Sequence, residues 1–305
     1  MTVFHNHDDG HCHEHKKPEF NKAFIISIAA NSVFVVFQIV FAFITNSTSL
    51  LADAIHNLGD VLSLVLAWIA NSLLKRKPTD RSTYGMKKTT ILAAFANGAL
   101  LIFTCGIIAT EAVNKLFHPS EIEAVGVMIV AGIGVIVNGA TAALFIRGDN
   151  DLNIRGAYLH LLYDALISVG VVVSAALIYW TNWYWVDPLV GIFIALIILK
   201  GTWGLFRDSF RLMIDGVPKG ISITEVRKHL EALDGVEGVH DLHVWAISTQ
   251  ENALSVHLWM PSQQLSDPSR QALSKELLSR FGIHHVTIQV ERTKEHCEDE
   301  CNAYL

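Results

Sequence analysis

The sequence predicts a membrane protein in two parts, a bundle of six apolar helices followed by a small α+β domain. Of its 305 residues, 51% are hydrophobic and only 17% are charged, whereas soluble domains carry about 25% charged residues. The mean hydropathy is +0.37, and the apolar residues are gathered in long blocks. The last third of the chain instead shows short amphipathic and alternating patterns, which are typical of an α+β domain.

Six apolar blocks are long enough to cross a bilayer, which takes about 20 residues each. They cover residues 23–45, 49–74, 90–116, 125–146, 154–180 and 188–206. The first block is long and follows a polar, histidine-rich start, so we do not expect a cleavable signal peptide. Short loops and the absence of a processed leader favour a bacterial inner membrane.

Basic residues mark alternate ends of these blocks, and this asymmetry predicts the orientation of the chain. The basic group comprises Lys16, Lys17, Lys22, Lys75, Arg76, Lys77, Arg81, Lys87, Lys88, Arg147, Arg155, Arg207 and Arg211. The intervening connections carry almost no basic charge. Both termini are therefore expected in the cytoplasm, and an aromatic belt is expected at Trp180, Trp183, Tyr184 and Trp185 on the outer side.

Four regions follow from these patterns: a histidine-rich, disordered tail over 1–20, a membrane domain over 21–212, a cytoplasmic domain over 213–292 and a tail over 293–305. The cytoplasmic domain reads as helix 224–235, strand 241–249, strand 252–260, helix 267–282 and strand 284–291. This order is αββαβ.

The net charge and the positions of the cysteines indicate which kinds of ligand the protein binds. The net charge of −6 gives no indication of nucleic-acid binding. Cys105 lies in an apolar block and is expected to be a packed thiol. Cys12, Cys297 and Cys301 lie among His, Asp and Glu residues, which favours metal binding over disulfides.

The second apolar block holds two titratable residues at helical spacing, His56 and Asp60. They share a helical face and lie about 10 and 16 Å below the outer end. The fifth block repeats the pattern with His160 and Asp164 at similar depth. Two imidazoles and two carboxylates that converge form a four-coordinate site suited to Zn²⁺.

A single polar residue in a membrane helix can also have a purely structural role. A lone histidine often hydrogen-bonds to a neighbouring helix, and a lone aspartate can line a water-filled cleft. Two matching pairs at one depth favour the metal site. Asp53 either guides ions or caps the start of its helix, and interhelical hydrogen bonds are expected for Asn31, Asn97 and Asn138.

Five segments together resemble the zinc-transporting branch of the cation diffusion facilitators. They are LLADAIHNLGD, YGMKKTTILAAFANG, HLLYDALISVG, DPLVGIFIALIIL and HDLHVW. The resemblance extends from about residue 20 to residue 291. It implies a homodimer in the lipid bilayer, with six helices per protomer and a ferredoxin-like, metallochaperone-like cytoplasmic domain.

The resemblance also implies antiport, with Zn²⁺ exported from the cytoplasm in exchange for protons by alternating access. It assigns the transported metal to His56, Asp60, His160 and Asp164. In this family a histidine at the position of His56 is associated with preference for Zn²⁺ over Cd²⁺. Ligand chemistry agrees, because imidazole suits zinc, although affinity order alone leaves Cd²⁺, Co²⁺ and Ni²⁺ open.

Proton exchange is consistent with the ligand chemistry, because imidazole titrates near neutral pH and binds metal only when deprotonated. We expect His160, His56 and at least one aspartate to carry the exchanged protons.

For the cytoplasmic domain, the resemblance implies a binuclear zinc site. His240, His257 and Glu291 match its ligands, His284 matches a further ligand of some relatives, and Cys297 and Cys301 match a pair that joins the site across the dimer. Gln289 stands where some bacterial relatives have a histidine ligand. From the residues alone, Asp241 and His243 share one strand face, and solvated strand histidines remain the alternative.

Two more features fit the resemblance. Lys88 and Asp215 match positions that form a charge interlock between the membrane and cytoplasmic parts. A plain positive-inside lysine is the alternative for Lys88. The N-terminal HNHDDGHCHEH either collects Zn²⁺ or has no measurable effect.

Rival functions are an intramembrane metalloenzyme, a membrane metal sensor and a metal uniporter without proton coupling. The sequence has neither H-E-x-x-H nor G-x-S-x-G, the signatures of a zinc protease or a serine hydrolase. We therefore expect a transporter and not an enzyme.

Overall fold

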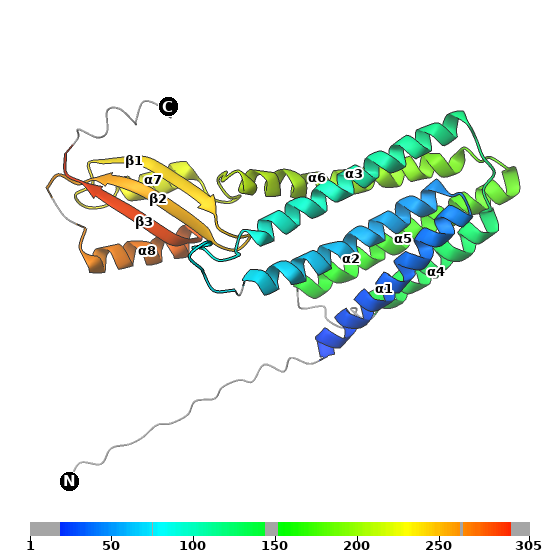
Figure 1. The fold of residues 1–305 in the computed structure, drawn as a ribbon, viewed down its shortest axis with the longest axis horizontal. Coiled ribbons are helices and arrows are strands. Elements are labelled where there is room, and N and C mark those ends of the chain that lie inside the picture. Colours follow the sequence, from blue (N-terminus) through cyan, green and yellow to red (C-terminus); the bar gives the residue numbers. More distant parts are fainter. Residues whose placement is uncertain (1–18, 75, 144–151, 263–264, 294–305) are drawn as a thin grey trace, which may run out of the picture. The chain divides into compact units, whose positions relative to one another are not determined.

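The computed structural model describes residues 19–74, 76–143, 152–262 and 265–293 (Figure 1). A helix lies at each of the six apolar blocks: α1 (Glu19–Ile44), α2 (Thr48–Leu74), α3 (Thr89–Phe117), α4 (Ala124–Ala143), α5 (Leu152–Thr181) and α6 (Val186–Met213). Five of these, α2 to α6, are long and apolar enough to cross a membrane, and α1 contributes the apolar stretch Ile28–Ile44. The histidine-rich tract, Cys12, Cys297 and Cys301 lie outside the described residues.

The chain divides into two compact units that do not follow its linear order. One unit comprises Met1–Asn57 with Ser120–Asp187, and the other comprises Leu58–Pro119 with Pro188–Leu305. The first unit contains α1, the first part of α2, α4 and α5. The second contains the remainder of α2, α3, most of α6 and the C-terminal domain.

Close packing in the first unit depends on small residues in α4. A Cβ atom at Gly134 would lie 2.9 Å from Cζ of Phe34 in α1 and 3.1 Å from Oγ of Ser168 in α5. Any larger residue would push these helices apart. Small residues at such crossings let helix backbones approach, which is how membrane helices gain packing energy.

A buried carboxylate holds the start of α2. Asp187 accepts hydrogen bonds from Oγ of Ser47 at 2.6 Å, the backbone N–H of Thr48 at 2.5 Å and Oγ of Ser49 at 2.5 Å. All four residues are at most 2% exposed. The first N–H groups of a helix have no partner within the helix, and Asp187 satisfies them while its charge complements the helix dipole. Asp187 thereby fixes the first turn of the helix that carries His56.

In the second unit, α3 and α6 approach closely at Gly98, where an added Cβ would lie 3.1 Å from Cβ of Phe206. Phe206 stacks on Phe95 with ring centroids 5.2 Å apart. Asn97 donates a hydrogen bond of 2.6 Å from α3 to Oγ of Ser63 in α2. This is the interhelical hydrogen bond expected for Asn97.

The C-terminal domain has the predicted αββαβ order. Its elements are α7 (Ile223–Glu231), β1 (Gly238–Ala246), β2 (Asn252–Trp259), α8 (Asp267–Phe281) and β3 (Ile283–Glu291). The sheet order is β1-β2-β3, with β1 and β2 antiparallel and β2 and β3 parallel. Leu230, Leu254 and Leu277 are fully buried in its core. The two-part fold class predicted from the sequence is confirmed.

Candidate metal centres

The membrane group centres on Asp164, which is 2% exposed in α5. Its Oδ1 lies 3.1 Å from Nε2 of His56 in α2, and its Oδ2 lies 3.7 Å from Nε2 of His160. The two imidazole rings meet edge to face, with centroids 6.3 Å apart. Two helices distant in sequence thus bring both predicted histidines to one carboxylate.

Asp60 follows His56 by one turn in the same continuous helix, α2. Residues four apart share a helical face, so His56 and Asp60 lie on the same side of α2. His160 reaches the carboxylate of Asp164 from α5. Nitrogen and carboxylate oxygen donors of this kind suit a four-coordinate divalent cation.

A polar layer adjoins this group and was not predicted from the sequence. Asp53 accepts hydrogen bonds from Nε2 of Gln38 at 2.6 Å and from Oγ of Ser168 at 3.0 Å. Gln38 in turn accepts one from Nδ2 of Asn57 at 3.2 Å. A glutamine within an otherwise apolar block was the available signal for Gln38. Ser168 is an ordinary residue for a membrane helix, and only helix packing reveals its contact with Asp53.

The cytoplasmic group comprises His240, His257 and Glu291, whose ligand atoms lie within 4.8 Å of one another. Glu291 Oε2 lies 3.0 Å from Nε2 of His240, and its Oε1 lies 3.1 Å from Nδ1 of His257. The two histidines are direct partners across β1 and β2. Each of the three strands therefore contributes one residue to a partly exposed cluster of nitrogen and oxygen ligand atoms.

A β-bulge adds a fourth candidate donor. The register of β1 against β2 shifts between His240 and His243, and Asp241 has a φ of 47°. Its carboxylate lies 2.7 Å from His243 and 3.4 Å from His257. Strict strand alternation would place adjacent residues on opposite faces. The bulge instead lets both His240 and Asp241 approach His257, which sequence periodicity does not reveal.

The structure does not bring His284 to this cluster. His284 lies at the opposite end of β3 from Glu291 and accepts a hydrogen bond of 3.4 Å from the backbone N–H of Asn252. Gln289 donates a hydrogen bond of 2.8 Å from Nε2 to Oε1 of Glu291. Cys297 and Cys301 lie outside the described residues.

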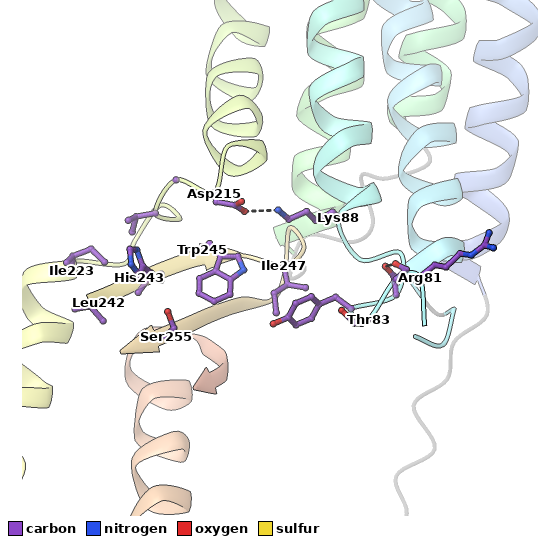
Figure 2. Close-up of a pocket in the computed structure, with 16 residues that line it drawn as sticks. Arg81, Thr83, Lys88, Asp215, Ile223, Leu242, His243, Trp245, Ile247 and Ser255 are labelled. Carbon is purple, nitrogen blue, oxygen red and sulfur yellow. Dashed lines mark hydrogen bonds and ion pairs between the residues drawn. The ribbon is translucent and has the colours of Figure 1, made fainter. Parts of the chain in front are cut away.

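Lys88 and Asp215 form an ion pair, with Nζ 2.7 Å from Oδ1 (Figure 2). The pair lies in the wall of a cavity of about 810 Å³ between the α2–α3 connection, the segment after α6 and the sheet. Its lining includes Trp245 of β1. Lys87 pairs with Glu251 at 2.5 Å in the same unit. Both side chains of the Lys88–Asp215 pair are more than half exposed.

Family models match both parts of the chain. The cation efflux transmembrane domain matches residues 24–214, and the cytoplasmic domain of cation efflux proteins matches residues 218–293. The two matches meet where the structure places the end of α6 and the beginning of the small α+β domain.

Full-length relatives are metal transporters. The chain is 37% identical over 298 residues to a cadmium, cobalt and zinc/H(+)-K(+) antiporter of Bacillus subtilis, covering 96% of this chain and 95% of that protein. It is 32% identical over 280 residues to the zinc transporter ZitB of Yersinia pestis, covering 91% and 89%. A solved metal-bound C-terminal domain of the CzcD transporter from Cupriavidus metallidurans is 35% identical, with a TM-score of 0.20, and covers 23% of this chain and 99% of that one.

The two transporters match nearly the whole chain, and their names describe them as carriers of metal cations. The expectation that the protein is a transporter and not an enzyme is therefore confirmed, as is a multi-pass integral membrane location. The chain belongs to the cation efflux family, the cation diffusion facilitators.

Proposed function

We propose that this cation efflux protein exports Zn²⁺ from the cytoplasm in exchange for protons by alternating access. The observation that carries the proposal is the meeting of His56 and Asp164 between two apolar helices, with Asp60 one turn further along α2. Ionisable residues inside membrane helices are expensive and mark ion pathways. Here a divalent cation offsets the charge of the two carboxylates.

The ligand types favour zinc as the substrate. Two imidazoles and two carboxylates, from His56, Asp60, His160 and Asp164, match a tetrahedral zinc site, and imidazole distinguishes it from the oxygen-only sites of harder cations. The names of the relatives include zinc, cadmium and cobalt. Cd²⁺, Co²⁺ and Ni²⁺ are therefore the competing substrates to be compared.

Proton exchange follows from competition at the same ligands. His56 and His160 bind metal only as neutral imidazoles, so that a proton and a metal ion exclude each other. Occupancy by metal in one half of the cycle and by protons in the other gives antiport. We propose that both histidines and at least one aspartate carry protons.

The cytoplasmic cluster of His240, His257 and Glu291 is proposed to bind a resident Zn²⁺ that regulates or stabilises a homodimer. Its mixed nitrogen and oxygen donors suit zinc, and Asp241 supplies a further carboxylate at 3.4 Å from His257. His284, Cys297 and Cys301 remain proposed contributors through the dimer or the C-terminal tail. The N-terminal histidines are proposed to collect Zn²⁺ for the cytoplasmic entrance.

Topology forms part of the same proposal. Both termini are placed in the cytoplasm by the distribution of basic residues, with the protein in a bacterial inner membrane. In that orientation the cytoplasmic zinc site and the Lys88–Asp215 pair lie on the side from which metal is taken up.

Metal flux in proteoliposomes tests the transport proposal. Wild type should move Zn²⁺ against its gradient when a pH gradient is imposed, and Asp60→Ala and Asp164→Ala should abolish this flux. Zn²⁺, Cd²⁺, Co²⁺ and Ni²⁺ are compared under the same gradient. Flux that is indifferent to the pH gradient would identify a uniporter, and metal binding without any flux would identify a sensor.

A further inference from the structure

Asp53 is a buried carboxyl that the proposed metal site does not use. It is 0% exposed. Its Oδ2 accepts the hydrogen bonds from Gln38 and Ser168. Its Oδ1 is buried and has no hydrogen-bond partner among the residues that the structure describes. One carboxyl oxygen thus accepts two hydrogen bonds, while the other has none from the described residues.

Its position links it to the metal site from both helices. Asp53 precedes His56 by one turn on α2, and its partner Ser168 follows Asp164 by one turn on α5. Residues three or four apart on a helix have Cβ atoms about 5–6 Å apart. The Asp53–Ser168 contact therefore forms the layer next to the His56–Asp164 contact, and both hydrogen bonds that Asp53 accepts come from residues outside the metal site.

Among the residues that the structure describes, few charged groups surround Asp53. His56 on its own helix and Asp164 on α5 act on it electrostatically. The neighbour from α1 is the neutral Gln38, and α4 contains no ionisable residue over Ala124–Ala143. No lysine or arginine is among these neighbours, so no fixed positive charge holds Asp53 in the ionised form.

A sealed carboxyl of this kind responds to the charge of its neighbours. Without a cation, an ionised Asp53 would leave a charged oxygen unpaired in a medium of low dielectric constant, which is far more costly than an unpaired neutral hydroxyl. With a divalent cation on the ligands one turn away, the attraction between opposite charges favours the ionised form. A divalent cation at the metal site and a proton on Asp53 therefore exclude each other, although they lie one helical turn apart.

We propose that Asp53 is a proton-binding site of the transport cycle, protonated on Oδ1 while the metal site is empty and ionised while a divalent cation occupies it. The inference rests on the proposed proton exchange and adds a proton that is not held by a metal ligand. When the cation binds, the O–H bond of Asp53 breaks, its electron pair stays on the carboxylate and the proton leaves to water. Because Asp53 is sealed, this exchange takes place when alternating access opens the site.

The test compares Zn²⁺ affinity across pH for full-length wild type and Asp53→Asn. The asparagine mimics the neutral carboxyl. At a pH low enough to keep Asp53 protonated even with the cation bound, the two proteins should bind Zn²⁺ equally. As pH rises, wild type should gain affinity over the variant, by up to about tenfold per pH unit, because its carboxyl now ionises on binding. Ser168→Ala keeps the carboxyl and should retain the pH slope of wild type.

Two results would overturn the inference while leaving proton exchange intact. One is a wild-type slope that Asp53→Asn reproduces. The other is a variant that is monodisperse but binds Zn²⁺ weakly at every pH, which would indicate a structural role. If instead wild-type affinity and flux are themselves independent of pH, the proposed function fails first.

Infrared difference spectra keep the inference testable if Asp53→Asn does not fold. Adding Zn²⁺ to wild type should remove a protonated-carboxyl C=O band. Ser168→Ala should shift that band to higher frequency, because the hydrogen bond to Oδ2 is lost. Either no band loss, or a band that Ser168→Ala leaves unmoved, would contradict protonation of Asp53.

Discussion

Asp164 is the residue on which the membrane site depends most. It is nearly sealed from solvent and its two oxygens face the two imidazoles separately, His56 through Oδ1 and His160 through Oδ2. A carboxylate so placed has few alternatives to a cation or a protonated imidazole as its partner. The adjacent Tyr163 is 64% exposed, which makes it a natural control.

Asp164→Asn should abolish metal transport. The substitution keeps the shape of the side chain but removes the charge that offsets the cation. Loss of a supporting residue already costs about 10- to 100-fold in metal affinity, so loss of a ligand should cost at least about 100-fold. Zn²⁺ titration calorimetry and vesicle flux measure the effect. Tyr163→Phe should behave as wild type, and unchanged affinity in Asp164→Asn would remove this residue from the site.

The cytoplasmic cluster gives a second prediction for single residues. His257→Ala should remove one bound Zn²⁺ per protomer, because His257 joins Glu291 to both His240 and Asp241. Metal analysis after desalting measures the stoichiometry. His284→Ala should lower the stoichiometry only in the dimer, because His284 is proposed to contribute across the dimer and lies apart from the cluster within one protomer. An unchanged stoichiometry in the dimer would remove His284 from the site.

At the scale of elements, hydrogen bonds from three other helices hold the first part of α2 in place. Its start is fixed by Asp187, and its second and third turns carry Asp53, His56 and Asn57. Gln38 of α1 and Ser168 of α5 hold the same stretch from either side. Hydrogen bonds at the start of α2 and at Asp53 thus position the helical stretch that carries His56.

Asp187→Asn should destabilise this helix start. The asparagine amide would face the N–H and hydroxyl donors of Ser47, Thr48 and Ser49 that the carboxylate now satisfies. Losing charged hydrogen bonds and leaving buried donors unpaired costs about 2–3 kcal/mol. Thermal unfolding in detergent measures it. Asp267→Asn, with a side chain 86% exposed, should change stability by less than about 0.5 kcal/mol. Equal midpoints for both variants would contradict the capping role.

At the scale of the whole molecule, the membrane helices and the cytoplasmic sheet must communicate if cytoplasmic metal regulates transport. Lys88 immediately precedes α3, and Asp215 follows α6. Both residues line the cavity beside β1, within one compact unit (Figure 2). An exposed ion pair contributes at most about 1 kcal/mol and is screened by salt. Its effect should therefore be on flux rather than on folding.

A double-mutant cycle tests this interlock. Lys88→Gln and Asp215→Asn should each lower flux by about two- to fivefold, and the double variant should be no worse than either single one. Neutral variants are preferable to a charge swap, because Asp215 has a φ of 59°, which asparagine tolerates and lysine does not. Asp208→Asn, which breaks the nearby pair with Lys219, serves as the control. Additive losses in the double variant would show that the two charges act independently.

How far the sequence predicts this protein depends on whether a feature is local. Helix-length apolar blocks, alternating strands and i, i+4 spacing are properties of neighbouring residues. The two-part fold, the shared helical face of His56 and Asp60 and the family resemblance therefore follow from the sequence. The β-bulge at Asp241 does not follow, because a shift in register depends on the partner strand.

The sequence by itself determined which residues are unusual: two His-Asp pairs in apolar helices, an aspartate at position 53 of an apolar block and a set of strand histidines. Only the tertiary structure decided which of them meet. It joined Asp164 to both imidazoles, grouped Glu291 with His240 and His257, left His284 apart, and gave Asp53 its partners Gln38 and Ser168. The physical reason is that helix rotation and strand register are fixed by packing against distant segments, where small residues such as Gly134 set how closely the helices approach.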